Sequence, residues 1–184
     1  MGQRRGAGGA EGPRTAATTQ RDVLLALGRI ALGGYWLWEQ HWKLPPDFGL
    51  HQPRGLMFAL QQSIRYPTLD VYKRFTEDVV VPHFHLFGWL VFLTEVGIGT
   101  SLTLGAFTKA GALLGTLQAA NLLVSQGRTP EGPWIYVALL AANMGALVAP
   151  TNRQLSVDRI LAPRVERTMA RHGGLLARVL RTVF

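Results

Sequence analysis

Four long apolar segments dominate this sequence and limit what the chain can fold into. They cover residues 23–42, 84–104, 107–124 and 134–149. A helix rises about 1.5 Å per residue, so each segment can cross a hydrocarbon core of about 30 Å, the last two near the short limit. Because lipid offers backbone groups no partners, each spanning segment must be a helix. The sequence therefore predicts an all-α membrane protein with a four-transmembrane-helix bundle over residues 22–150.

The composition agrees with this prediction and excludes several kinds of chemistry. Hydrophobic residues make up 48% of the 184 positions. The chain contains no cysteine, which excludes disulfides, thiolate zinc sites and iron–sulfur clusters held by its own thiolates. Electron transfer in this protein therefore requires a bound cofactor or another subunit.

Basic residues indicate how the bundle is oriented. Much of the net charge of +8 lies before the first span, at the turn between the second and third spans, and after the fourth. The positive-inside rule places these regions in the cytoplasm, so we expect both termini inside and the protein in the inner (cytoplasmic) membrane. This topology explains the basic residues, and no aromatic stacking platform accompanies them, so nucleic-acid binding is not expected.

The regions outside the spans have distinct patterns. Residues 1–21 are rich in Gly, Ala, Arg and Thr and are expected to form a disordered cytoplasmic tail. The outer loop, residues 44–82, is too long for a simple connection, and helical spacing over 55–66 predicts a short helix in a cap over the bundle. The basic tail, residues 151–184, contains two amphipathic stretches, 156–171 and 175–184. They suit either the inner leaflet or a partner subunit.

Each predicted span carries a polar side chain in what we expect to be one layer. Arg29 lies about 9 Å and Glu95 about 14 Å from the inner ends of their helices, with Gln118 and Asn143 at similar depth. Charges in the membrane interior are costly and need partners or a purpose. One interpretation is a polar pocket for a quinone head group, where Glu95 exchanges a proton. The other is an Arg29–Glu95 ion pair with interhelical hydrogen bonds from the two amides.

A second polar group is expected at the outer ends of the first two spans. It comprises Glu39, His41, Lys43, His83 and His85. Lys43, with Lys73 in the loop, could attract an anionic substrate, and Glu39 and Lys43 could also pair at i and i+4. His83 and His85 diverge by about 200° on a helix, and interfacial histidines commonly act as anchors. We therefore predict no metal site.

Several motifs resemble one known family. The segment LGRIALGGYWLWEQHWKL is similar to the opening helix of the DoxX family. The stretch that follows resembles its DoxD-like branch, the small subunits of thiosulfate:quinone oxidoreductase, through PHFHLFG, the intramembrane Glu95 and the hairpin LGAFTK. LSVDRIL after the last span fits the family's closing segment. The resemblance covers about residues 24–161.

The resemblance implies a function and a partner. It implies a four-helix membrane subunit of a quinone-linked oxidoreductase, working beside a second subunit and passing electrons from thiosulfate or another reduced donor to quinone. Arg29 and Glu95, and less directly Lys43, are the positions it marks. The alternative function is a non-catalytic membrane scaffold or an accessory subunit of a larger respiratory or photosynthetic complex. The expected partner is another membrane subunit or, in a homo-oligomer, further copies of this chain. A transporter is disfavoured, because the spans lack the broken helices typical of midplane substrate sites.

Overall fold

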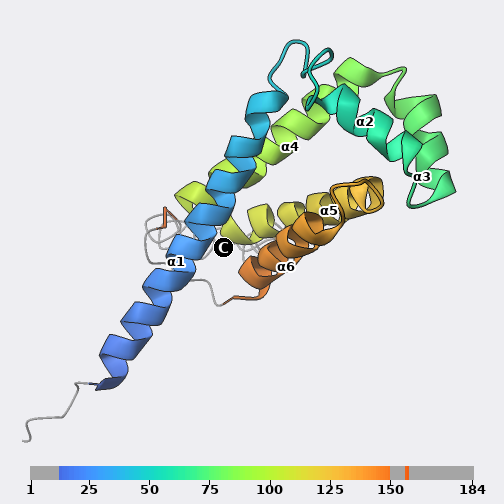
Figure 1. Cartoon of the computed structure of the whole chain (residues 1–184). Coiled ribbons are helices and arrows are strands. Elements are labelled where there is room, and N and C mark those ends of the chain that lie inside the picture. The colour runs from blue at the N-terminus through green and yellow to red at the C-terminus, as the bar shows by residue number, and fades with distance from the viewer. Residues whose placement is uncertain (1–12, 150–155, 158–184) are drawn as a thin grey trace, which may run out of the picture.

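The computed structural model describes residues 13–149 together with residues 156 and 157, and that part of the chain is built from helices alone (Figure 1). Four long helices are α1 (Pro13–Glu39), α4 (Phe84–Leu104), α5 (Thr108–Gln126) and α6 (Trp134–Val148). The short helices are the 3₁₀ turn η1 (Gln40–Trp42), α2 (Leu56–Arg65), α3 (Asp70–Phe75) and the π-helical η2 (Thr76–Val80). The all-α prediction is confirmed for these residues.

The first helix is longer than expected. It begins at Pro13, where proline is favoured because its missing N–H is not needed in the first turn. Residues 13–21, which we expected in a disordered tail, therefore belong to the same helix as the residues that follow them. Residues 1–12, and the amphipathic stretches expected within 156–171 and 175–184 apart from residues 156 and 157, lie outside the described residues.

Glycine lets α1 and α4 pack closely as an antiparallel pair. A Cβ atom added to Gly33 would lie 2.6 Å from the backbone nitrogen of Thr103 and 2.8 Å from the carbonyl oxygen of Gly99. No side chain fits there, so the two backbones meet directly at this point. Trp36, Ile98 and Leu102 form part of the adjoining core and are almost fully buried.

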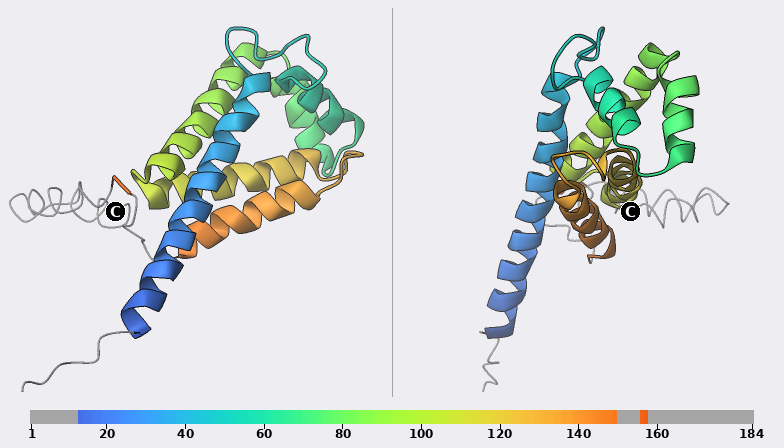
Figure 2. Two further views of the ribbon diagram at one scale, coloured as in Figure 1. Left: turned by 60° about the vertical axis from the view of Figure 1, so that its left-hand side comes forward. Right: turned by 45° about the vertical axis from the view of Figure 1, so that its right-hand side comes forward.

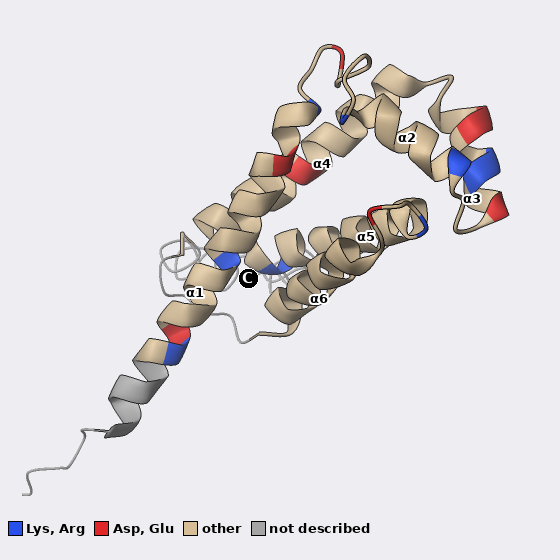
Figure 3. Cartoon of the chain, viewed as in Figure 1, with Lys and Arg blue, Asp and Glu red and all other residues tan. Residues whose placement is uncertain are grey.

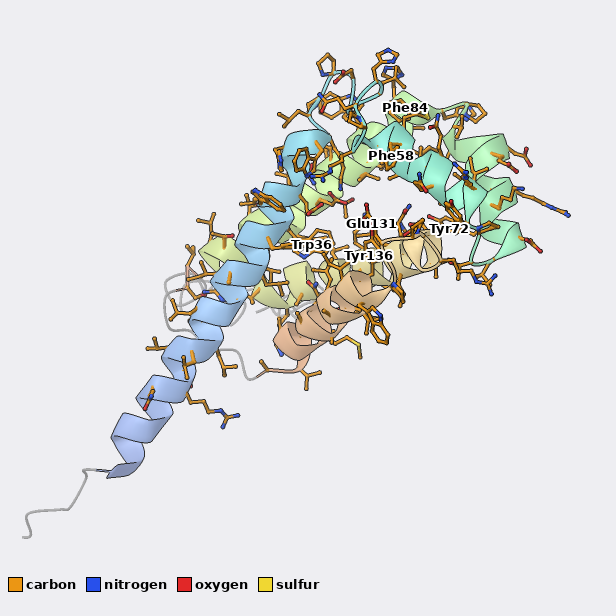
Figure 4. All side chains as sticks on the ribbon, in the orientation of Figure 1. Trp36, Phe58, Tyr72, Phe84, Glu131 and Tyr136 are labelled. Carbon is orange, nitrogen blue, oxygen red and sulfur yellow. The ribbon has the colours of Figure 1, made fainter. Side chains whose placement is uncertain are left out.

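Helices α5 and α6 form a helical hairpin that follows α4. Gly105 ends α4 in the left-handed region at φ 66°, which glycine adopts without steric cost, and α5 then starts at Thr108. Helices α5 and α6 run side by side, as both views in Figure 2 show. Trp36 extends from α1 toward this hairpin (Figure 4) and its Nε1 donates to Asn143 Oδ1 on α6 at 3.4 Å.

Residues 44–82 form an outer cap that contains the expected short helix, α2, together with α3 and η2, which we did not predict. Phe48 anchors the cap: it is fully buried against the rings of Phe84 and Trp89. At the far side, beside the end of α5 (Figure 4), Tyr72 Oη donates to Asn121 Oδ1 at 3.0 Å. Burial raises the pKa of the Tyr72 hydroxyl.

Helix α4 is a candidate membrane span. Within the described residues it is the one helix that is both long and apolar enough to cross a membrane, and α6 is a shorter apolar helix. Only 28% of the apolar window of α4 is buried, whereas a core helix of a soluble protein would be mostly buried. Leu90 and Leu93 are more than half exposed. These exposed apolar side chains are suited to contact with lipid.

Candidate functional site

The most buried charge in the described structure is the carboxylate of Glu95, halfway along α4, with 1% of the residue exposed. Three side chains donate hydrogen bonds to it. Lys43 Nζ lies 2.9 Å from Oε2 and 3.3 Å from Oε1, Gln118 Nε2 lies 3.3 Å from Oε1, and Gln40 Nε2 donates to Oε2. We call these four residues the Glu95 cluster.

The end of α1 explains how Lys43 reaches a carboxylate in the middle of α4. The helix tightens into η1 after Glu39, and the backbone N–H of Lys43 donates to Gln40 O at 2.9 Å. Because Gly33 and Gly99 hold the two helices together, the end of α1 lies against the middle of α4. The Lys43 side chain is 15% exposed. Lys43 therefore links the buried carboxylate to the surface near the outer cap.

Gln40 has an acceptor that the described residues leave unused. The residue is 4% exposed, its amide nitrogen is committed to Glu95, and its Oε1 receives no hydrogen bond from the described residues. A buried acceptor without a donor costs about 1–3 kcal/mol. The cluster therefore holds an acceptor, Gln40 Oε1, that can receive a hydroxyl or N–H group of a ligand.

The Arg29–Glu95 ion pair, one of the two interpretations of the predicted layer, is wrong, because Lys43 pairs with Glu95. Arg29 instead donates from Nη1 to the carbonyl oxygen of Leu102 at 2.7 Å. Leu102 lies about 10 Å from Glu95 along α4, near the end of that helix, where carbonyl groups lack helical partners and attract cations. The depth argument failed because it compared helices as if their inner ends were level. The actual register places position 29 opposite the last turns of α4.

Of the two predicted amides, only Gln118 joins Glu95. Asn143 is fully buried, but its Nδ2 donates to Leu139 O at 2.8 Å within α6 and its Oδ1 accepts from Trp36. It therefore connects α6 with α1 and has no contact with the carboxylate. The single predicted layer is in fact three separate sites, at Glu95, Asn143 and Arg29.

The residues of the predicted outer group also lie apart from one another and have different partners. Lys43 pairs with Glu95 rather than with Glu39, since η1 interrupts the α-helical i, i+4 spacing. His83 Nδ1 contacts Val79 O at 2.9 Å, and the ring of His85 packs against Phe48 and Phe84. Neither histidine belongs to the Glu95 cluster. The described residues contain no group of three or more His, Asp or Glu side chains that could hold a metal ion.

Sequence reasoning missed Gln40, although a signal was present. Gly33, Trp36, Gln40 and Lys43 follow one another at three- and four-residue spacing, which places them on one face of a helix. Gly33 and Trp36 are buried against other helices, so the two polar residues that continue this face point the same way. Following that face to the end of the helix would have identified Gln40 and Lys43, two of the three partners of Glu95.

The cluster combines a carboxylate, an ammonium and two amides in a site shielded from water. Such a group can bind a polar head group and can accept or donate a proton. Figure 3 shows the acidic position of α4 close to the end of α1. No protein-family model, curated protein or solved structure matches this chain.

Proposed function

We propose that this protein is a small multi-pass membrane subunit of a quinone-linked oxidoreductase, similar to the DoxD-like subunits, and that the Glu95 cluster binds the quinone head group. In this proposal α1, α4, α5 and α6 cross the inner membrane with both termini in the cytoplasm. Support comes from the apolar and largely exposed α4, and from the amide side chains of η1 and α5 that donate to Glu95 instead of facing lipid.

The unused acceptor of Gln40 beside a buried Lys–Glu pair is the observation that carries this proposal. Reduction of a quinone takes two electrons and two protons, which convert its two carbonyl oxygens into hydroxyls. Lys43 and Gln118 have N–H donors for a carbonyl oxygen, and Gln40 Oε1 can accept from the hydroxyl formed. Donor and acceptor atoms thus fit both forms of the head group.

The partly exposed position of Lys43 gives protons a route into the cluster. Lys43 contacts both oxygens of Glu95 and is itself 15% exposed. Protons can thus pass between the outer side and Glu95 without crossing the apolar part of the bundle. The electrons come from thiosulfate or another reduced donor and reach the quinone through a bound cofactor or a partner subunit, because this chain has no cysteine to ligate an iron–sulfur cluster.

Quinone reduction by the purified protein tests the proposal. The protein is extracted in mild detergent with its co-purifying partners, and thiosulfate-dependent reduction of decylubiquinone is followed spectroscopically. We expect Glu95→Gln to lower the rate by about 10²-fold or more, the size of effect typical of a positioned acid–base group. Glu77→Gln, the same change on the exposed surface of η2, should leave the rate unchanged. A folded wild-type preparation that is inactive with its partners contradicts the proposal.

A membrane scaffold is the second candidate, and one observation favours it. The Glu95 carboxylate already accepts hydrogen bonds from three side chains, as expected of a purely structural ion pair. In that case Lys43→Met combined with Glu95→Leu should keep both fold and activity of the complex. Stoichiometric partners that are lost when residues 153–184 are deleted would favour the scaffold, and a self-contained oligomer would count against it.

A further inference from the structure

A groove between α1, the start of α5 and the end of α6 lies apart from the Glu95 cluster. Its volume is about 280 Å³. The walls are mostly apolar or small side chains, among them Leu25, Gly28, Leu32, Ala142, Gly145 and Ala146. Two cationic residues, Arg29 and Lys109, also line it. Figure 3 shows the basic positions of α1 and α5 that flank this region.

Helix ends hold both cations in place. Arg29 donates to Leu102 O in the last turns of α4, and Lys109 Nζ donates to Leu147 O at 2.7 Å and to Ala149 O at 3.2 Å at the end of α6. An ammonium has three N–H donors, and these carbonyls use two of those of Lys109. None of the described Asp or Glu residues forms an ion pair with Lys109. Its charge is thus fixed at the groove, and no carboxylate of the described residues neutralises it.

We propose that this groove binds one anionic phospholipid of the cytoplasmic leaflet, an inference that rests on the membrane placement proposed above. The phosphate lies at Lys109 and Arg29, and the upper part of one acyl chain lies along the apolar walls. A volume of 280 Å³ is near the lower limit of about 300 Å³ for pockets that enclose a ligand, so the rest of the lipid remains in the bilayer. Free phosphate would gain nothing from the apolar walls.

Two glycines leave the groove wide enough for a lipid acyl chain. A Cβ atom added to Gly28 on α1, or to Gly145 on α6, would meet no other atom within 4 Å. Larger side chains at these positions would therefore occupy the groove without displacing protein backbone. Gly97 on α4 is equally unobstructed and does not line the groove, so it supplies a matched control.

Lipid titration of the whole chain in detergent, followed by native mass spectrometry, tests the proposal. Phosphatidylglycerol and phosphatidylcholine serve as probes. We expect one phosphatidylglycerol per chain, held about tenfold more tightly than phosphatidylcholine, and about tenfold weaker binding for Lys109→Gln, since a charge-assisted hydrogen bond contributes roughly that factor. Lys109→Arg should retain the preference. Equal binding of the two lipids overturns the proposal.

Variants that fill the groove with larger side chains test the proposal even if Lys109→Gln fails to fold. Gly28→Leu with Gly145→Leu should abolish the preference for phosphatidylglycerol, whereas Gly97→Leu should keep it. A blocked variant that binds phosphatidylglycerol like the wild type overturns the inference. Different results would contradict the proposed oxidoreductase function. Loss of quinone reduction with intact lipid preference contradicts only the oxidoreductase proposal, and release of the chain from membranes by alkaline carbonate contradicts both.

Discussion

Two Lys–Glu pairs in this protein have the same chemistry and very different surroundings. Lys43 and Glu95 are 2.9 Å apart with side chains 15% and 1% exposed, whereas Lys73 and Glu77 are 3.8 Å apart and both side chains are 39% exposed. Water screens the second pair, so its members depend little on each other. The first pair has lost water, and each charge depends on its partner. The buried pair therefore fixes the end of α1 against α4, while the exposed one lies on the surface of the cap.

Removing one member of the buried pair should have the largest effect on stability. Lys43→Met leaves the Glu95 carboxylate buried without its counter-ion, and breaking such a pair typically costs about 3–5 kcal/mol. We expect the free energy of unfolding in detergent, measured by denaturant titration and tryptophan fluorescence, to fall by that amount. Adding Glu95→Leu should restore much of the loss, since no unpaired charge then remains. An unchanged midpoint for Lys43→Met would show that water reaches the cluster.

Disrupting the close contact between α1 and α4 should have the second largest effect on stability, because the buried Lys43–Glu95 pair depends on this contact. Gly33→Ala places a Cβ atom within 2.6–2.8 Å of backbone atoms of Thr103 and Gly99. The helices must separate, at a cost of about 1–3 kcal/mol for overpacking. Gly34→Ala is the matched control, since its Cβ would meet no atom within 4 Å. The same denaturant titration should show a loss for Gly33→Ala alone; equal values for both variants would contradict the packing argument.

The sequence predicted the helices of this fold better than their register. Apolar length predicted α4 with its observed bounds, and predicted α5 and α6 within one or two residues. The α1–α4 register depends on where Gly33 meets Gly99, a contact between segments far apart in the chain. Counting residues from helix ends therefore assigned Arg29 to Glu95. Gln118 was placed in the layer of Glu95, whereas Gln40 and Lys43 reach Glu95 from the 3₁₀ turn that ends α1, on the helix face that Gly33 and Trp36 begin.

A substitution in the outer cap should lower stability less than one at the α1–α4 contact, because hydrogen bonds at the far side of the cap are partly open to solvent. Tyr72→Phe removes the bond to Asn121, worth about 0.5–1.5 kcal/mol. Hydrogen exchange should quicken in α2 and α3 and stay unchanged in α4.

Burial raises the pKa of Tyr72 above its ordinary 10.0, so the folded state holds this proton more tightly than the unfolded state. The wild-type cap should therefore lose stability as pH rises above about 10, and Tyr72→Phe should lose less over that range.

The exposed pair should show the smallest effect and so complete the comparison. Lys73 and Glu77 are four residues apart on one helical surface, and such pairs contribute about 0.3–0.5 kcal/mol in water. Lys73→Met should change the free energy of unfolding by no more than this, and 0.5 M salt should remove most of the difference by screening. The same salt should leave the effect of Lys43→Met nearly intact, because ions do not reach a carboxylate that is 1% exposed. A loss from Lys73→Met as large as that from Lys43→Met would mean that burial is not what separates the two pairs.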